Sequence, residues 1–548
     1  MDQPSPPTLV VIPARGGSKG IPRKNLRLLC GRPLLYYVIR TARQLGAAAA
    51  DVVVTSEDEE ILLTAAKYGA TPLRRNPALS GDAVTLDGVI HDALARTEEQ
   101  RGHRYDLVVT MQPTSPLLRP ASLRAALDRM AAQPTLDTLL SVVDDRHLAW
   151  ETDDEGNLRP AYAARLNRQY LPPRFRETGG FLIARRAAVG PDSRFGDRVG
   201  VHELGEAEGI DIDTYDDWAR CEYHLSRRRV VISLAGYREI GLGHAYNMLA
   251  VAGGILEHEV LFVLDRRSDY AAELIGRHHY PIVRQGDEPL TRTILDLDPD
   301  VVISDRLDTT ADYVTALREG GCLTINFEDL GPGAARADLV INAMYPERSV
   351  QPGHYFGHRY FCLRNEFLLT EDRVTVRPRV THVLLTFGGT DPGDLTQRVL
   401  NLIYPLCRRA GIAVSVVLGL GYQRDLPPRP GVTVLRNVSD MSARMLAADL
   451  AFTSAGRTTF EVASLGLPTV VLCQNEREVS HFFATAEYGF RNLGLGTAVA
   501  DAEILRAFDE LIDDAGQRRY MAELMRGPEI RAGKRRVLEL IKQKIASA

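Results

Sequence analysis

The chain has 548 residues, too many for one hydrophobic core, and at roughly 100–200 residues per domain this length predicts about three domains. Apolar residues make up 45% of the chain and charged residues 25%, which is typical of folded globular proteins and excludes a disordered or fibrous class. A net charge of −5 gives no general attraction to nucleic acid or to a membrane surface, so anionic ligands must bind at local basic sites.

The sequence suggests neither a membrane segment nor an N-terminal signal peptide. No run of 18 or more apolar residues occurs, and the N-terminal stretch lacks the basic segment and apolar core of a signal peptide. We therefore expect a cytoplasmic protein. The six cysteines show no C-x-x-C spacing, so neither a disulfide framework nor a zinc site is indicated, and buried free thiols are expected.

In the first part of the chain, apolar runs of strand length alternate with longer patterns of helical period. The predicted elements are, in order, a strand at 9–14, a helix at 33–46, a strand at 51–56, a helix at 60–69, a strand at 106–112 and a helix from Ala121. This alternation predicts an α/β domain with a parallel sheet covered by helices on both faces.

The same alternation restarts after a basic hinge, Ser226 to Arg229. Two series of strands follow, at 230–236, 259–265, 300–305, 322–327 and 338–343, and then at 382–389, 414–420, 432–437, 450–456 and 468–473. Helical patterns at 504–525 and 537–546 close the chain. We predict three domains, 1–226, 230–375 and 376–548, of which the last two are similar Rossmann-like halves with a cleft between them.

A glycine-rich basic loop, ARGGSKGIPRKN, runs from Ala14 to Asn25 directly after the first predicted strand. Its glycines let the backbone approach a polyanion closely, and Arg15, Lys19, Arg23 and Lys24 add four cations. The loop suits a nucleoside triphosphate, although it matches neither the Walker A nor the G-x-G-x-x-G pattern. Taken alone, it could also be an ordinary surface loop.

Together with MQPTSP at 111–116 and Asp211-Ile212-Asp213, this loop resembles the CMP-sialic acid synthetases, over residues 8 to about 225. The resemblance implies a Rossmann-like nucleotidyltransferase domain that uses CTP. It implies triphosphate contacts for Arg15, Lys19 and Lys24, and cytosine and ribose contacts for Asn25, Arg75 and Gln112. Gly16 and Gly17 belong to the expected CTP site, and Arg15 and Lys24 are expected to assist catalysis.

Asp211 and Asp213 are the expected metal ligands. Two carboxylates at i and i+2 on an extended segment point the same way and can hold a hard cation, usually Mg²⁺, that bridges phosphate oxygens. The resemblance implies the same role for this pair.

Arg168 and Gln169 lie in a stretch, RQYLP, that resembles the family's sugar-binding insertion. A guanidinium matches a carboxylate in bidentate geometry, so Arg168 is the expected contact for an acidic sugar, and an ordinary surface arginine is the alternative. Family members usually continue with Asn-Gly-Ala, whereas this chain has Thr178-Gly179-Gly180, so the sugar could be of the sialic, legionaminic or pseudaminic type. The resemblance also implies a homodimer formed through residues 140–175.

The expected reaction is in-line attack of the sugar's anomeric hydroxyl on the α-phosphate of CTP, with release of pyrophosphate. Catalysis would rest mainly on positioning and on charge neutralisation.

In the second part of the chain, GLGHAYN places His244 at a strand-to-helix turn, where an imidazole can act as a base. Taken alone, the motif fits a helix-capping or packed histidine equally well. Phe387 to Asp391 ends one predicted strand, and Ser454 to Glu461 ends another and opens a helix. Both turns would present backbone N–H groups to a diphosphate, and Glu461 could accept hydrogen bonds from ribose hydroxyls.

These motifs resemble the UDP-sugar hydrolase of pseudaminic acid biosynthesis, over residues 230 to about 535. The resemblance implies a glycosyltransferase-B-type arrangement of two Rossmann-like domains, with His244 activating a water molecule. The implied UDP contacts are Gly389, Thr390, Gly456, Thr458, Thr459 and Glu461. That family usually reads Gly-x-Gly-His-x-x-Arg, whereas position 247 is Asn.

Three hypotheses therefore apply to the second part of the chain. It hydrolyses a UDP-linked amino sugar, which gives a bifunctional enzyme of nonulosonic acid biosynthesis. Alternatively, it is a sugar-nucleotide-binding module that has lost hydrolysis, or a glycosyltransferase that uses the CMP-sugar. Expected ligands are CTP, an acidic sugar and a UDP-sugar, without nucleic acid or membrane.

Overall fold

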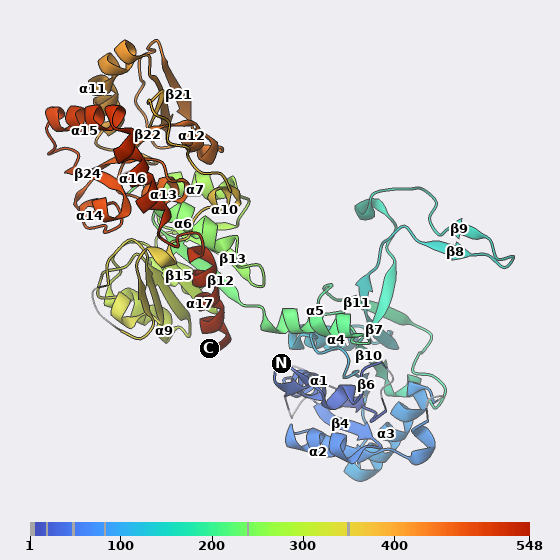
Figure 1. The fold of residues 1–548 in the computed structure, drawn as a ribbon. Coiled ribbons are helices and arrows are strands. Elements are labelled where there is room, and N and C mark those ends of the chain that lie inside the picture. The colour runs from blue at the N-terminus through green and yellow to red at the C-terminus, as the bar shows by residue number, and fades with distance from the viewer. Residues whose placement is uncertain are drawn as a thin grey trace. The chain divides into compact units, whose positions relative to one another are not determined.

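A computed structural model describes residues 6–17, 20–46, 50–81, 84–237, 240–347 and 351–547. The chain divides into two compact units, residues 1–227 and 228–548, and the division falls within the basic hinge (Figure 1). The predicted α/β class, with one Rossmann-like domain followed by two Rossmann-like halves, is confirmed.

The first unit is built on a seven-stranded sheet in the order β11-β7-β10-β6-β1-β4-β5, with helices packed against it. Its strands are β1 (Thr8–Pro13), β4 (Ala50–Ser56), β5 (Thr71–Arg74), β6 (Leu107–Thr110), β7 (Thr138–Asp144), β10 (Phe175–Arg185) and β11 (Val199–Glu203). Its α-helices are α1 (Leu34–Arg43), α2 (Glu59–Lys67), α3 (Leu86–Arg101), α4 (Pro120–Ala132) and α5 (Tyr215–Ser226). Short strands β2 (Leu28–Leu29) and β3 (Arg32–Pro33) pair separately.

The sheet departs from the predicted parallel arrangement at β10, which runs antiparallel to both β6 and β7. A parallel pair needs a crossover connection, usually a helix, whereas the chain between β7 and β10 leaves the sheet and returns without one. The register of β10 against β7 shifts between Glu177 and Leu182, at the Thr178-Gly179-Gly180 segment.

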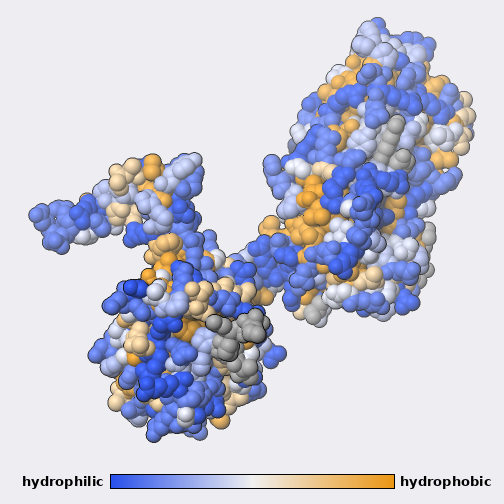
Figure 2. All heavy atoms as spheres, turned by 180° about the vertical axis from the view of Figure 1, so that it is seen from behind, coloured by the Kyte–Doolittle hydropathy of each residue, from blue (hydrophilic) through white to orange (hydrophobic). Residues whose placement is uncertain are grey.

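The connection from β7 to β10 forms an arm that projects from the first unit (Figure 1). It contains a small hairpin of β8 (Trp150–Thr152) and β9 (Leu158–Pro160). Large apolar side chains on the arm and at the start of β10 are exposed, namely Trp150, Leu158, Leu166 and Tyr170, and then Phe175. On the face seen in Figure 2, hydrophobic residues cover part of the arm behind a hydrophilic tip.

The second unit begins with a sheet of seven parallel strands in the order β14-β13-β12-β15-β16-β17-β18. The strands are β12 (Arg229–Leu234), β13 (Glu259–Leu264), β14 (Ile282–Arg284), β15 (Val301–Asp305), β16 (Leu323–Phe327), β17 (Leu339–Asn342) and β18 (His354–Phe356). The helices are α6 (Gly243–Ala252), α7 (Asp269–Gly276), α8 (Leu290–Leu295), α9 (Ala311–Glu319) and α10 (Asn365–Leu369).

The second half of this unit has six parallel strands in the order β21-β20-β19-β22-β23-β24, the doubly wound order in which the first strand is central. The strands are β19 (His382–Thr386), β20 (Ala413–Leu418), β21 (Val432–Arg436), β22 (Leu450–Thr453), β23 (Thr469–Cys473) and β24 (Phe490–Leu495). The helices are α11 (Leu395–Ala410), α12 (Met441–Ala447), α13 (Thr458–Leu465), α14 (Glu476–Val479), α15 (Asp501–Asp513), α16 (Ala515–Arg526) and α17 (Gly533–Ser547).

The last three helices differ in two ways from the predicted helices and domain limits. The helical pattern at 504–525 divides at Asp514, whose side chain accepts a hydrogen bond from the Gln517 N–H (2.9 Å) and so caps α16. Helix α17, although its sequence lies within 376–548, buries Val537 and Ile541 in the core of the preceding sheet. The end of the chain therefore ties the two halves together.

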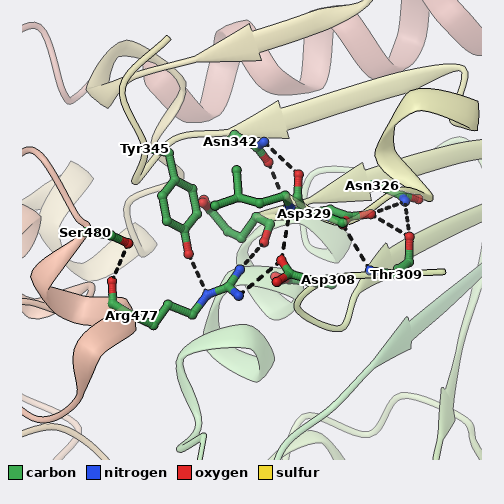
Figure 3. A network of polar contacts seen from close by, with 12 residues as sticks. Asp308, Thr309, Asn326, Asp329, Asn342, Tyr345, Arg477 and Ser480 are labelled. Atoms are coloured by element: carbon green, nitrogen blue, oxygen red, sulfur yellow. Dashed lines mark hydrogen bonds and ion pairs between the residues drawn. The ribbon is translucent and has the colours of Figure 1, made fainter. Parts of the chain in front are cut away.

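A polar network joins loops of the two halves (Figure 3). Arg477 donates to the Tyr345 hydroxyl (2.6 Å) and to the Glu328 carbonyl oxygen (2.8 Å), and it pairs with Asp308 (3.1 Å). Beside it, the buried Asp329 carboxylate accepts hydrogen bonds that include those from Thr309 and Asn326. Fully bonded buried polar groups fix loop geometry, so the loop that carries Glu328 is held rigidly.

Among the described residues, no helix has both the length and the apolar character needed to cross a bilayer. The cysteines are free, and five of them are buried as predicted. The prediction is wrong for Cys30, which is exposed in the turn between β2 and β3.

Candidate active sites

The first unit contains a cavity of about 590 Å³ where parallel strands β1, β5 and β6 end. Its lining includes Arg15, Lys24, Asn25, Arg75, Gln112, Asp211 and Asp213. The structure thus brings together seven residues that the sequence predicted from separate segments. Ligands of open α/β sheets commonly bind at this edge, outside the carboxyl ends of the strands.

The glycine-rich loop rests on an acidic side chain that the sequence analysis did not single out. The Gly16 N–H donates to Glu57 Oε1 (2.7 Å), and Arg75 Nη1 lies 3.5 Å from Glu57 Oε2. Arg75 also donates to the carbonyl oxygens of Ala14 (3.3 Å) and Thr55 (2.8 Å). Burial lowers the pKa of Arg75. Its hydrogen bonds to backbone oxygens on both sides hold the loop in place.

Lys24 links the basic loop to the acidic segment on the opposite side of the cavity. Its ammonium group donates to the Ile212 carbonyl oxygen and lies 3.2 Å from Asp213 Oδ1. Asn25 Nδ2 donates to the Arg15 carbonyl oxygen (2.9 Å), which fixes the backbone of the loop. Positive and negative groups thus line one cavity, as a metal-bound polyphosphate requires.

Asp211 is a partly buried carboxylate next to the exposed Asp213. Burial chiefly raises the pKa of Asp211, and the negative charge of Asp213 raises it further. A hard cation would relieve both effects, so the pair fits a magnesium ion. In the described part of the chain no cluster of three or more potential ligands occurs, so an ion here would complete its shell with ligand or water oxygens.

Several buried polar atoms around this cavity have no hydrogen-bond partner among the described residues. They are Asn25 Oδ1, Arg75 Nε and Ser115 Oγ, whereas the Thr114 hydroxyl and the Asp211 carboxylate interact with each other. Since buried polar groups are nearly always bonded, a cluster of unbonded donors and acceptors indicates a place for a polar ligand.

Gly179 approaches the cavity closely from β10. Its carbonyl oxygen accepts a hydrogen bond from the Gln112 N–H (3.0 Å), and a Cβ there would meet Ser115 Oγ at 2.9 Å and Asp211 Oδ1 at 3.2 Å. A side chain at position 179 would therefore displace groups that line the site or lie beside it.

The other predicted residues of this site are placed differently. Gly16 and Gly17 lie in the loop beside Arg15 but do not line the cavity. Lys19 lies outside the described residues. Arg168 and Gln169 are exposed on the arm, in the short 3₁₀ helix Arg168–Tyr170, and do not line the cavity of the same chain. Their contact with a sugar stays a prediction.

The second unit contains a cavity of about 270 Å³ whose walls come from both of its sheets. From the first half, Gly241 to His244 line it, and from the second half the loops that follow β19, β20, β22 and β23 do so. Five of the six predicted UDP residues are among the lining, namely Gly389, Thr390, Gly456, Thr458 and Glu461.

The sixth, Thr459, lies behind this surface. It is buried, and its hydroxyl donates to the Gly456 carbonyl oxygen (2.7 Å), which shapes the turn into α13. Glu461, predicted to bind ribose hydroxyls, accepts a hydrogen bond from Arg364 Nε through Oε1 (2.7 Å).

His244 faces this cavity from the first turn of α6, and its Nδ1 lies 2.5 Å from Asp305 Oδ1. Asp305 ends β15 and is fully buried. Its Oδ2 accepts a hydrogen bond from Asn247 Nδ2 (2.7 Å). Asn247 thus binds Asp305 and does not line the cavity. Asp305 was missed in the sequence, although it ends a predicted strand.

Further ionisable groups surround His244. Burial raises the pKa of Glu328 to about 7, and burial lowers the pKa of Arg457. Burial also lowers the pKa of His481 to about 4, so that its ring is neutral near pH 7, with Nδ1 2.7 Å from the Ala455 carbonyl oxygen. His481 thus positions the loop before α13.

Both cavities combine the carboxyl ends of parallel strands, glycine-containing turns and charged side chains, an arrangement common at the ligand sites of open α/β proteins. Residues 9–190 match the family described as Cytidylyltransferase. The CMP-N,N'-diacetyllegionaminic acid synthase of Legionella pneumophila is 31% identical over 221 residues, which cover 39% of this chain and 94% of that protein. The chain belongs, through its first unit, to the cytidylyltransferase family.

Two further relatives show the breadth of the similarity. N-acylneuraminate cytidylyltransferase A of Danio rerio is 32% identical over 226 residues, or 40% of this chain and 50% of that protein. The spore coat polysaccharide biosynthesis protein SpsG of Bacillus subtilis is 26% identical over 288 residues, or 49% of this chain and 84% of that protein. The chain spans about half the length of the first curated relatives it matches.

Proposed function

We propose that the first unit transfers CMP from CTP to an acidic sugar of the nonulosonic type and releases pyrophosphate. The observation that carries this proposal is the cluster of unbonded buried polar atoms in a cavity lined by Arg15, Lys24 and two carboxylates. The names of the related proteins, which include a legionaminic acid synthase and an N-acylneuraminate cytidylyltransferase, support the sugar class.

In this reaction the sugar's hydroxyl oxygen forms a bond to the α-phosphorus, its proton is lost to solvent, and the bond to the β-phosphate breaks. Arg15 and Lys24 would bind the negatively charged phosphates, and the loop held by Glu57 and Arg75 would keep them in line. Asp211 and Asp213 would hold Mg²⁺, which supplies neutralisation of phosphate charge.

The test is pyrophosphate release by the full chain with CTP, Mg²⁺ and a panel of nonulosonic acids. We expect release with at least one acid of the sialic, legionaminic or pseudaminic type, and none when CTP is replaced by ATP. Absence of release with every acid in the panel would contradict the proposed substrate class.

Gly179 offers a structural test of the same site. Replacing it by Ala is expected to slow pyrophosphate release by about tenfold, because the added carbon would displace Ser115 or Asp211 by a few tenths of an ångström. The matched control is Gly205→Ala, whose added carbon would lie no closer than 3.9 Å to any neighbour. Equal rates in the two variants would show that the close approach of Gly179 is irrelevant to the site.

We propose that the second unit hydrolyses a UDP-linked amino sugar. The observation in favour is His244, bonded to a buried carboxylate and facing a cavity lined by glycine-containing turns suited to a diphosphate. His244 Nε2 would take a proton from water, the water oxygen would bond to the anomeric carbon, and the bond from that carbon to the UDP oxygen would break. The products are a free sugar and UDP.

The test is UDP release from UDP-linked amino sugars by the full chain. Hydrolysis requires release without any acceptor other than water. Release only in the presence of an added sugar acceptor would favour a glycosyltransferase, and binding of UDP without release would favour a module that only binds sugar nucleotides.

We also propose a homodimer formed through the arm. The support is the set of large apolar side chains that this arm leaves exposed in the single chain, among them Trp150, Leu158 and Tyr170. Sedimentation of the full chain tests it, and a monomer at micromolar concentration would contradict it.

A further inference from the structure

Asp305 is a buried carboxylate whose described partners are an imidazole and an amide. It is fully buried at the end of β15, and its two oxygens accept hydrogen bonds from His244 on one side and Asn247 on the other. Burying a carboxylate costs several kcal/mol unless its oxygens are well bonded. Because burial of Asp305 is costly, its position beside the cavity-lining His244 calls for an explanation.

The spacing of the two donors follows from the helix. His244 and Asn247 are three residues apart on α6, so they lie on the same face, toward the end of β15. A carboxylate only accepts hydrogen bonds, so the bond to Asp305 requires that His244 Nδ1 carries the hydrogen. In the neutral imidazole, Nε2 is then left as the acceptor.

We propose that Asp305 and Asn247 together are positioning residues that hold His244 in the tautomer with hydrogen on Nδ1 and the Nε2 lone pair available. The proposal rests on the hydrolysis proposed above only for its consequence on rate. Among the described residues, Glu328 and His481 interact electrostatically with His244, and Arg457 lines the same cavity. Asp305 is the one with a described hydrogen bond to the ring.

Asn247 therefore has a structural role of its own, although the motif that the sequence resembles usually has Arg at this position. An amide at this position supplies the hydrogen bond that Oδ2 needs but no positive charge. The Asn247 amide also determines which atom of residue 305 must accept a hydrogen bond. As long as Asn247 donates, the atom of residue 305 that faces it has to be an oxygen.

This constraint predicts the effect of two isosteric substitutions. In Asp305→Asn, the amide oxygen would face Asn247 and the amide NH₂ would face His244, so Nδ1 would accept and the hydrogen would move to Nε2. In the double variant Asn247→Asp with Asp305→Asn, the carboxylate introduced at position 247 would accept from the amide NH₂. The amide oxygen would then again face His244 and restore the hydrogen on Nδ1.

The experiment is ¹⁵N NMR of histidine-labelled full-length protein at alkaline pH, where imidazoles are neutral, with the His244 signals assigned from His244→Ala. We expect hydrogen on Nδ1 in the wild type, on Nε2 in Asp305→Asn, and on Nδ1 again in the double variant. UDP release should fall on the order of 10³-fold in Asp305→Asn and recover at least tenfold in the double variant. Pyrophosphate release from CTP should stay unchanged in all three proteins.

The outcomes separate the two proposals. Hydrogen on Nε2 in the wild type, or a tautomer that does not respond to Asp305→Asn, overturns the positioning role, and the wild-type measurement decides this even if a variant does not fold. The predicted tautomers without UDP release in the wild type would leave the positioning role standing and contradict hydrolysis. UDP release that depends on His244 but not on Asp305 would support hydrolysis and contradict the positioning role.

Discussion

Replacing Asp211 by Asn is expected to reduce Mg²⁺-dependent pyrophosphate release by about 100-fold or more. An amide is a weaker ligand for a hard cation than a carboxylate. Neutralisation of phosphate charge by such a cation stabilises the transition state by several kcal/mol, and about 1.4 kcal/mol corresponds to a tenfold change in rate. Release of pyrophosphate from CTP and an acidic sugar, measured against Mg²⁺ concentration, tests this.

The same substitution should not destabilise the protein. The pKa of Asp211 is raised by burial, so its ionised form is less favourable in the folded than in the unfolded chain. Without bound metal, this carboxyl opposes folding increasingly as the pH rises from its unfolded pKa to its raised folded pKa, and an amide removes that cost. The melting temperature of Asp211→Asn near pH 7 should therefore equal or exceed that of the wild type.

The control for this prediction is Asp216→Asn. Asp216 is exposed in the first turn of α5, and its substitution removes the same charge a few residues away. We expect a rate close to that of the wild type. A wild-type rate in Asp211→Asn, or an equal loss in both variants, would show that Asp211 does not hold the catalytic ion.

The strands near the cavities could be predicted because each is a short apolar run followed by polar or glycine residues. Strands β1, β4, β6, β12 and β15 fall within a residue or two of their predicted limits. The reversed direction of β10 could not be read in this way. The direction depends on the path of the arm between β7 and β10, and no local pattern records it.

Side chains that act through others were also hard to find. Arg75 was selected for contact with a nucleotide, and its described side-chain hydrogen bonds go to backbone oxygens of Ala14, just after β1, and of Thr55 in β4. Glu57 and Asp305 follow or end predicted strands, as ligand-binding residues do, but nothing in the sequence says which residue lies opposite. Asn247 shows the limit most clearly. Its departure from the Gly-x-Gly-His-x-x-Arg motif suggested a lost function, whereas in the structure it bonds to Asp305.

Replacing His244 by Ala is expected to lower UDP release by about 10²–10⁴-fold, the range for removal of a positioned base. The nearby His481 is a poor replacement, because burial lowers its pKa to about 4 and so makes its ring a weak base. Since His244 would act on water rather than bind UDP, the affinity for UDP should change little. Calorimetric titration with UDP, beside the rate of UDP release, measures both quantities.

The two units supply the control for this variant within one molecule. Pyrophosphate release from CTP should be unchanged in His244→Ala, because His244 belongs to the second unit and the CTP cavity to the first. His278→Ala, an exposed histidine that does not line the cavity, should retain both activities. UDP release at the wild-type rate in His244→Ala would contradict the hydrolase. Loss of UDP binding with the same substitution would instead make His244 a ligand contact, because a base that acts only on water contributes to the rate and not to the affinity.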